Sequence, residues 1–261
     1  APDAPPFRLM NPEARAHRLE KLGVERLYEL NFNAALAGLS PREFAEKVIR
    51  DGLGLSHVVV GADFCFGKGR AGDAADLVAF GKEMGFGVTI AELLEGDNGG
   101  VSSTAIRNAL TDGRPRDAAR MLGHWHRIDG PVIGGEQRGR ELGYPTANMP
   151  VPAETGLAPG VYAVRLRRDD GTLHDGVASF GRRPTFHADG APLLETFVFD
   201  FAGDLYGKVL TVTLVAYIRP ELKFDGMDAL IAQMDRDSAA ARTALAGLAP
   251  LGPLDRAVNF R

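Results

Sequence analysis

Cysteine is nearly absent from this sequence, since Cys65 is the only one among 261 residues. A single cysteine excludes an internal disulfide framework and any zinc site built from four cysteines. No apolar run approaches the roughly 20 residues that a membrane-spanning helix needs, and the start of the chain does not resemble a signal peptide. No internal repeat or low-complexity tract is evident. We therefore expect a cytoplasmic globular protein.

Excess positive charge is also lacking. Lys and Arg number 30 against 34 Asp and Glu, giving a net charge of −4, and they are scattered along the chain. Such a sequence has no basic stripe to neutralise a nucleic-acid backbone. We expect small-molecule partners, no nucleic acid or membrane partner, and a monomer or weak homo-oligomer. A length of 261 residues with 45% hydrophobic content favours two compact units.

The first half of the chain alternates helix and strand signals, which favours an α/β domain with a parallel sheet. A capping box, Ser40 to Glu43, begins one of the predicted helices. A β-branched run, residues 57–60, has the pattern of a buried parallel strand. The further predicted helices are residues 11–22 and 74–84, and the further predicted strands are residues 26–30 and 86–91.

The predicted secondary structure changes near Gly123. The segments that follow have strand patterns and are separated by the turn-forming residues Gly, Pro and Asp. They predict a small antiparallel β-barrel, with strands at 130–135, 160–167, 175–180, 195–201 and 209–217. A final helix is predicted from Asp225 to about Leu245. The expected domains are residues 1–122 and 123–247, followed by a loose tail, residues 248–261.

Two glycine-rich segments look like phosphate-binding loops. The segment Gly67–Gly72 matches GxGxxG, and Glu92 lies where a ribose-binding acid is expected in a nicotinamide-dependent oxidoreductase. However, residues 62–66 separate these glycines from the preceding strand, whereas a dinucleotide fingerprint leaves the strand directly, so a nicotinamide-binding fold is disfavoured. A glycine-rich loop near a nucleotide and glycines that simply permit a tight loop are the two competing explanations. The second segment, residues 134–141, lacks the Lys and the hydroxyl that a P-loop requires.

His124 and His126 flank Trp125 in an HxH pattern that is compatible with a metal site. No third ligand lies nearby in the sequence. Packing at a domain junction is therefore the favoured explanation for these two histidines.

The segment Gly139–Asn148 reads GRELGYPTAN and closely resembles the signature of riboflavin kinases. Later blocks of that family follow in the same order across about 120 residues. They are GVYA at 160–163, GRRPTF at 181–186, ETF at 195–197 with Asp200 and Phe201, DLYG at 204–207, and RPELKF at 219–224. The resemblance implies a magnesium-dependent transfer of the ATP γ-phosphate to the 5′-hydroxyl of riboflavin, giving FMN.

The chemistry of these blocks suits phosphoryl transfer, which requires positioning, hard oxygen ligands for Mg²⁺ and a base for the attacking alcohol. Thr146 and Asn148 are two residues apart, so an extended segment turns both oxygens to one face. The resemblance makes them the metal ligands and Glu195 the general base. It assigns ATP and phosphate binding to Gly134, Gly139, Arg140, Gly143, Pro145 and Thr146, and flavin binding to Arg219, Glu221, Met234 and Asp235.

The first half resembles the adenylyltransferase module of bifunctional bacterial riboflavin kinase/FAD synthetases, which implies a Rossmann-like nucleotidyltransferase α/β domain. The resemblance rests on residues 60–72, which include Asp63, Phe64, Gly67 and Arg70, and on residues 101–107. Ser103, Thr104 and Arg107 are expected to begin a helix that faces ATP phosphates, although a plain helix cap also explains that segment.

The family's GxFDGxH and HxGH elements are not present in this sequence, so this α/β domain is expected to be incomplete. The chain as written is therefore not expected to make FAD. One alternative from another class stays open, a non-catalytic flavin-binding or regulatory protein that keeps the barrel without turnover.

Overall fold

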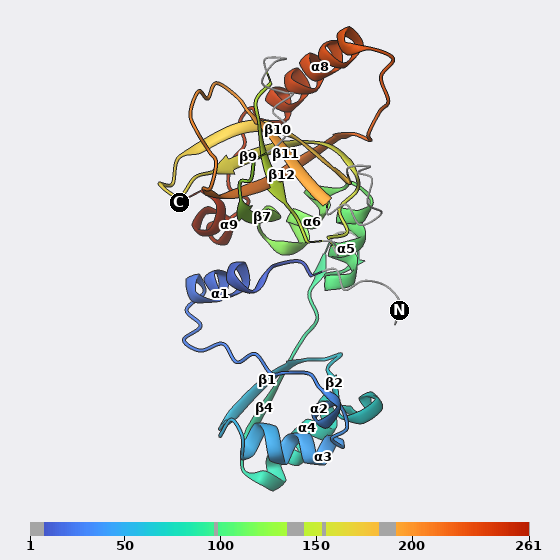
Figure 1. Cartoon of the computed structure of the whole chain (residues 1–261). Helices are drawn as coiled ribbons and strands as arrows, with labels where there is room; N and C mark the ends of the chain where they lie inside the picture. Colours follow the sequence, from blue (N-terminus) through green and yellow to red (C-terminus); the bar gives the residue numbers. More distant parts are fainter. Residues whose placement is uncertain (1–7, 97–98, 135–143, 153–154, 183–191, 261) are drawn as a thin grey trace. The chain divides into compact units, whose positions relative to one another are not determined.

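The computed structural model describes residues 8–96, 99–134, 144–152, 155–182 and 192–260 (Figure 1). The chain divides into two compact units. One is Arg26–Val101, and the other combines Ala1–Glu25 with Ser102–Arg261. Among the described residues, no helix has both the length and the apolar character needed to cross a bilayer.

The unit Arg26–Val101 is built on two parallel strands, β1 (His57–Gly61) and β4 (Gly87–Ala91), in which Val59 lies opposite Thr89. This parallel pairing agrees with the predicted α/β class. The remaining elements are α2 (Ala34–Ala37), α3 (Pro41–Phe44), the π-helical η1 (Ala45–Arg50), β2 (Cys65–Phe66), η2 (Lys68–Arg70), β3 (Gly72–Asp73), α4 (Ala74–Met84), β5 (Glu95–Gly96) and β6 (Gly99–Gly100).

The predicted capping box is confirmed at the start of α3. The Glu43 N–H donates to Ser40 Oγ at 3.3 Å, and the Ser40 N–H donates to Glu43 Oε2 at 3.0 Å. These contacts satisfy amides that the first helical turn leaves without partners. The π-helical η1 that follows α3 packs Ala45 and Ile49 into a core with Val60 and Leu77.

The strand predicted at residues 26–30 is wrong. No strand is assigned there, and Leu27, Tyr28 and Leu30 are exposed. A strand requires the hydrogen bonds of a neighbouring strand, and the structure pairs no described segment with these residues. Their apolar, alternating pattern alone does not supply that neighbour.

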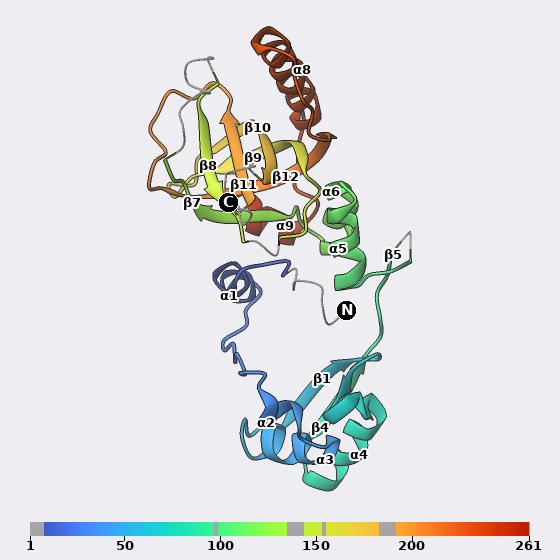
Figure 2. The same cartoon turned by 45° about the vertical axis from the view of Figure 1, so that its right-hand side comes forward.

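A six-stranded antiparallel sheet forms most of the other unit, in the order β7-β12-β9-β10-β11-β8 (Figure 2). A bridge between Ile133 and Asn148 joins the two ends of the sheet, so the barrel is nearly closed. The strands are β7 (Arg127–Pro131), β8 (Thr146–Pro150), β9 (Gly160–Arg167), β10 (Leu173–Arg182), β11 (Pro192–Val198) and β12 (Val209–Arg219). The predicted barrel is thus confirmed, although β8 was not among its predicted strands.

The two faces of the barrel follow from the two-residue period of its strands. On β9, Tyr162, Val164 and Leu166 are fully buried in the interior, with α5 (Ser103–Thr111) and α6 (Pro115–Leu122) packed at the same core. On the outer face, Ala163 packs with residues of the predicted final helix, α8 (Met227–Leu245). That helix begins after Gly226 rather than at Asp225.

The tail predicted to be loose is instead ordered. Helix α9 (Pro253–Asn259) buries Asp255, which accepts hydrogen bonds from the Trp125 N–H at 3.0 Å and the Leu251 N–H at 2.8 Å. Helix α1 (Pro12–Lys21) packs against α9 and donates from Lys21 Nζ to the Ala257 carbonyl at 2.9 Å. The tail was missed because its partners lie over 100 residues away in the sequence.

The boundaries of the compact units in the sequence differ from the predicted boundary near Gly123, because the chain divides after Glu25 and again after Val101. Helices α5 and α6 pack with the barrel, and α1 does so from the start of the chain. The expected functional division into residues 1–122 and 123–247 stays a prediction, because packing units and functional modules need not share a boundary.

Candidate active site

The predicted metal ligands and the predicted base meet on neighbouring strands. In the antiparallel pairing of β8 with β11, Asn148 lies directly opposite Glu195, and Thr146 lies directly opposite Phe197. Directly opposed residues point to the same face with Cβ atoms about 4.5–5.5 Å apart. The register therefore brings Thr146, Asn148 and Glu195 together on the outer face of the barrel, although Glu195 is 47 positions from Asn148 in the sequence.

Directly opposed residues on the next two strands extend this set across the outer face of the barrel as a row. Glu195 on β11 lies opposite Ser179 on β10, and Ser179 lies opposite Val161 on β9. Glu195 and Phe197 are half-buried, whereas their neighbours Leu194 and Thr196 are turned into the interior. The sequence pattern predicted neither this row nor the position of Ser179 beside the carboxylate.

Asn148 has an unusual environment for an amide side chain. It is only 4% exposed, and its Oδ1 atom is buried with no hydrogen-bond partner among the described residues. Leaving a buried acceptor unsatisfied costs about 1–3 kcal/mol, and a water, an ion or a ligand removes that cost by completing it. In the described part of the chain Asn259 Oδ1 and Thr196 Oγ1 are also buried without a partner, so the position of Asn148 in the lining of a cavity beside Thr146 distinguishes it. The orphaned oxygen beside the Thr146 hydroxyl fits a hard cation such as Mg²⁺.

A cavity of about 480 Å³, here called the first cavity, opens beside this strand. Its lining includes Pro145, Thr146, Asn148, Val132 and the loop 201–206. The loop adds the apolar surfaces of Phe201, Leu205 and Tyr206 together with one carboxylate, Asp204. A lining that combines side-chain oxygens with apolar surfaces suits a ligand with a phosphate group and a flat ring.

A second cavity, of about 240 Å³, lies on the other side of Thr146. Thr146 lines both cavities, whereas Asn148 lines only the first and Glu195 only the second. The second cavity is walled by the outer faces of β9, β10 and β11, by α8 and by the segment after β12. Its residues include Val161, Val177, Ser179, Phe197, Arg219, Glu221, Phe224, Leu230 and Met234.

The predicted flavin-binding residues gather around the second cavity with one difference. Arg219 is bound to Asp237 of α8, with Nε–Oδ1 at 2.9 Å and Nη2–Oδ2 at 2.7 Å, and its guanidinium lies over Phe224. Arg219, Glu221 and Met234 line the cavity. Asp235 does not line it, and its carboxylate instead accepts a hydrogen bond from the Tyr144 hydroxyl.

Glu221 lies close to one glycine of the barrel. A Cβ atom on Gly181 of β10 would lie 2.1 Å from Glu221 Oε1, so a larger residue there would require the exposed Glu221 side chain to move. The segment after β12 therefore passes near β10 at the edge of the second cavity.

Several predicted phosphate-binding residues lie outside the described residues. These are Gly139, Arg140 and Gly143, in the segment 135–143. Gly134 lies just before that segment and is exposed, and Pro145 lines the first cavity. Both ends of the segment therefore carry residues that the sequence assigned to phosphate binding.

In the unit Arg26–Val101, the GxGxxG segment forms the turn of a hairpin. Strand β2 ends at Phe66 and pairs antiparallel with β3, which begins at Gly72. Gly67 has a positive φ of 75°, and a Cβ there would lie 2.7 Å from the backbone of Pro41. This geometry explains the glycine and does not match the strand-to-helix turn of a dinucleotide fingerprint.

The other predicted nucleotide-binding residues of the first half lie on two elements. Asp63 and Arg70 are exposed around that hairpin, and the Phe64 ring stacks on Phe66 at 5.5 Å. In the barrel unit, Ser103 and Thr104 are exposed in the first turn of α5. The cap of α5 is Ser102, whose Oγ accepts from the Ala105 N–H at 3.1 Å, so the predicted helix start is confirmed. Arg107 follows one turn later and is half-buried.

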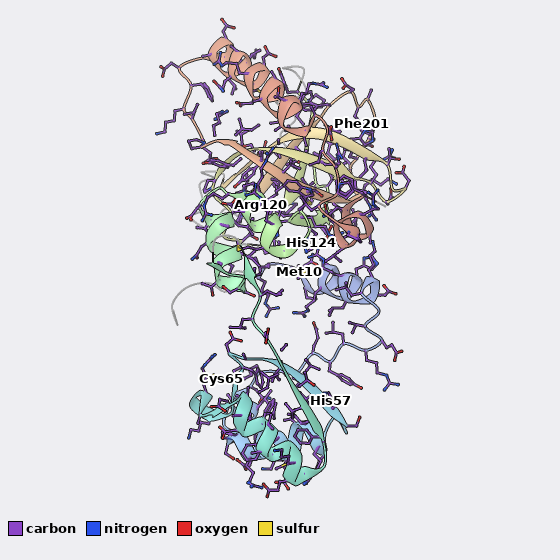
Figure 3. All side chains as sticks on the ribbon, turned by 180° about the vertical axis from the view of Figure 1, so that it is seen from behind. Met10, His57, Cys65, Arg120, His124 and Phe201 are labelled. Carbon is purple, nitrogen blue, oxygen red and sulfur yellow. The ribbon has the colours of Figure 1, made fainter. Side chains whose placement is uncertain are left out.

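The HxH histidines are buried in the barrel unit, where Figure 3 labels His124. Burial lowers the pKa of His124 to about 4 and that of His126 to about 3, with the positive charge of Arg18 acting in the same direction. Within the described part of the chain, no three His, Cys, Asp or Glu side chains converge as a metal site. The packing explanation for these histidines is therefore the better one.

Comparison with known proteins identifies both halves of the chain. A sequence model described as riboflavin kinase matches residues 122–245, and one described as FAD synthetase matches residues 1–105. A relative from Listeria monocytogenes, named bifunctional riboflavin kinase/FMN adenylyltransferase, is 38% identical over 238 residues, covering 90% of this chain and 74% of the relative. A relative of the same name from Pseudomonas fluorescens is 43% identical over 220 residues, covering 84% and 70%.

A solved structure from Streptococcus pneumoniae, described as a macrolide-efflux protein, is similar with a TM-score of 0.80 and 34% identity. The similarity covers 90% of this chain and 76% of that one. Its description concerns the pneumococcal protein alone, and the similarity shows that the two chains share a fold.

Proposed function

Because this chain belongs to the family of bifunctional riboflavin kinase/FMN adenylyltransferases, we propose that its barrel transfers the γ-phosphate of ATP to the 5′-hydroxyl of riboflavin. The riboflavin oxygen forms the new bond to the γ-phosphorus, and the bond from that phosphorus to the β,γ-bridging oxygen breaks. The products are FMN and ADP. The observation that carries this proposal is the register in which Asn148 faces Glu195 between two cavities that share Thr146.

The first cavity is the proposed site of ATP. Its apolar loop residues, Phe201, Leu205 and Tyr206, offer surfaces for the adenine ring, and the end near Thr146 and Asn148 faces the triphosphate. Gly134 and Pro145, together with Gly139, Arg140 and Gly143 of the intervening segment, are the proposed phosphate contacts. The γ-phosphate is proposed to lie near Thr146, the residue that lines both cavities.

Thr146 and Asn148 are the proposed ligands of Mg²⁺, through the hydroxyl oxygen and Oδ1. When bound there, the ion would neutralise charge on the triphosphate oxygens. The buried Oδ1 atom without a partner supports this role, because coordination would satisfy it.

The second cavity is the proposed site of riboflavin. Phe197, Phe224, Leu230 and Met234 provide the apolar surface that a flavin ring needs, while Arg219 and Glu221 provide polar groups. The 5′-hydroxyl would then lie near Glu195, which accepts its proton as the bond to phosphorus forms. Ser179, directly opposite Glu195, offers a hydroxyl to the ribityl chain.

For the first half of the chain we propose the nucleotide-binding part of the second activity named for its relatives, adenylyl transfer to FMN, a reaction that the chain as written is not expected to complete because it lacks the HxGH element. Asp63, Phe64, Gly67 and Arg70 of the hairpin region are the proposed nucleotide loop. The first turn of α5, with Ser103 and Thr104, presents free amides and the positive end of a helix dipole to phosphates, and Arg107 adds a guanidinium.

We also propose that the reaction takes place in the cytoplasm. A chain with one cysteine among 261 residues suits a reducing compartment. Small molecules, namely ATP, riboflavin and FMN, are its proposed partners.

The kinase proposal is tested by incubating the chain with riboflavin, ATP and Mg²⁺ and measuring FMN and ADP. Glu195→Gln keeps the size and polarity of the side chain but removes the base, so turnover is expected to fall about 100-fold or more with little change in riboflavin binding. Glu25→Gln removes an exposed carboxylate that lines neither cavity, so it is the matched control and should retain full turnover. Riboflavin binding without FMN formation by the unaltered chain would favour the non-catalytic alternative.

A further inference from the structure

Tyr144 connects two parts of the proposed kinase site that no strand pairing joins. It lies two residues before Thr146 and lines the second cavity. Its hydroxyl donates a hydrogen bond to Asp235 of α8, and its ring packs at 4.8 Å from the ring of Phe197. One side chain therefore contacts β11, α8 and the proposed riboflavin cavity at the same time.

Asp235 lies on the helix whose other residues form one wall of the second cavity. Asp235 itself does not line the second cavity, but its helix neighbours Leu230, Met234 and Ser238 do. The hydrogen bond thus runs from the segment that leads into the proposed metal ligands to the helix that forms a wall of the riboflavin cavity. Neither end has to touch the substrate in order to affect where it lies.

Helix α8 is not part of the sheet and is held against the barrel by side-chain contacts. Ala241 and Leu245 pack in a core with Ala163, Arg242 binds Asp200, and Arg219 of β12 binds Asp237. Residues 235 and 237 are two positions apart, which on an α-helix places them about 200° apart around the axis. The contact at Asp235 therefore adds a restraint on a different side of the helix, beside the residues of α8 that line the second cavity.

Resting on the proposed kinase function, we propose that Tyr144 and Asp235 form a positioning contact for phosphoryl transfer. The contact keeps the helical wall of the riboflavin cavity in a fixed place relative to Thr146 and Asn148. In-line transfer demands reacting atoms about 3–3.5 Å apart, so a small displacement of this wall moves the 5′-hydroxyl out of reach. Tyr144 and Asp235 are thus positioning residues rather than catalytic ones.

The ionisation state of Tyr144 is compatible with this role. The hydrogen bond to Asp235 raises the pKa of Tyr144 to about 12, with loss of hydration as a smaller cause. The hydroxyl therefore remains a donor at every pH at which the kinase would be assayed.

The test separates the hydroxyl from the ring. Tyr144→Phe keeps the packing on Phe197 and removes only the donor, whereas Asp235→Ala removes the acceptor and Asp235→Asn keeps an acceptor oxygen. Tyr144→Phe and Asp235→Ala are expected to lower kcat/KM for riboflavin about 3- to 10-fold, as loss of one exposed bond to a charged acceptor implies. Asp235→Asn should recover part of that loss, and the double variant Tyr144→Phe/Asp235→Ala should be no worse than either single one.

Three further measurements make the outcome decisive. The variants should lower kcat at saturating riboflavin, leave MgATP affinity without riboflavin unchanged, and keep the melting temperature within about 2 °C of the unaltered chain. Asp228→Asn, which changes an exposed acid in the first turn of the same helix, is the control and should retain full activity. Unchanged riboflavin kinetics in Tyr144→Phe, or additive losses in the double variant, would overturn the positioning role.

The proposal and the function on which it rests fail in different ways. If the unaltered chain forms no FMN, the kinase function fails. If the unaltered chain forms FMN, and Tyr144→Phe and Asp235→Ala form it with the same riboflavin kinetics, the kinase function stands and the positioning contact fails.

Discussion

Replacing Asn148 by Leu should make the ligand-free chain more stable and remove its kinase activity. Asn148 is 4% exposed and its Oδ1 atom is buried without a partner among the residues that the structure describes. Leu has a similar volume and no polar atom, so the substitution removes an unsatisfied acceptor that costs about 1–3 kcal/mol. Part of that gain is lost to imperfect packing of the branched side chain, so a net increase of about 1 kcal/mol in the free energy of unfolding is expected.

Thermal and urea unfolding measure this change. For a folded unit of this size, about 1 kcal/mol corresponds to a rise of about 2–4 °C in melting temperature, and the urea midpoint should rise without a change in slope. MgATP at about 100 times its Kd should stabilise the unaltered chain by about 2.7 kcal/mol and should stabilise the Asn148→Leu chain much less. FMN formation should be lost in the same variant.

Thr196→Val is the matched control for this experiment. Thr196 is 1% exposed on the same strand as Glu195, and its hydroxyl is also buried with no partner in the described part of the chain, but it faces the barrel interior. Its replacement should stabilise the chain and leave FMN formation intact. If Asn148→Leu were destabilising and fully active, Asn148 would be a packing residue and the metal-ligand assignment would be refuted.

Three more results are expected. Thr146→Ala should raise the Mg²⁺ concentration needed for half-maximal FMN formation, and an unchanged magnesium titration would contradict its ligand role. Arg219→Ala should lower the free energy of unfolding by about 3–5 kcal/mol in urea, because Asp237 is left buried without its cation, and a loss below 1 kcal/mol would contradict this. The folded-state pKa values of His124 (about 4) and His126 (about 3) lie below the unfolded value of 6.5, so unfolding takes up protons and stability falls as pH drops from 6.5 toward 4. Urea midpoints at pH 7 and pH 5 should differ for this reason and should differ less in His126→Phe.

Local signals in the sequence predicted the parts of the fold that depend on neighbouring residues. The capping box of Ser40 and Glu43 fixed the start of α3, because both partners lie within one turn. The cap of α1 by Asn11 was equally predictable, since its Oδ1 accepts from the Ala14 N–H at 2.7 Å. The run at 57–60 became the parallel strand β1, as its β-branched composition predicted. Its predicted burial was wrong, because β4 is its one neighbour among the described strands and Val59 is 65% exposed.

Features that depend on distant partners could not be predicted in this way. Residues 26–30 have the composition of a strand but no described strand beside them. Strand β8 was not among the predicted barrel strands, because its ladder partner β11 begins 42 residues after it ends. Asp255 of α9 accepts a hydrogen bond from the Trp125 N–H, 130 positions away, and no local sequence pattern predicts that contact.

The candidate site shows the same division. Resemblance to a family singled out Thr146, Asn148 and Glu195, but only the register of β8 and β11 brings them onto one face. The loop 201–206 was quoted for its family resemblance without a role, and its place in the first cavity supplies one. The hydrogen bond between Tyr144 and Asp235 joins residues 91 positions apart and had no sequence signal.

The central claim is that one barrel holds ATP and riboflavin on either side of Thr146, with Glu195 as the base. The most direct measurement follows ATP labelled at its γ-phosphate during incubation of the chain with riboflavin and Mg²⁺. The label is expected to appear in FMN, with one ADP formed per FMN, and to be lost in Glu195→Gln. Label released only as inorganic phosphate, or FMN formed at an undiminished rate by Glu195→Gln, would contradict this account.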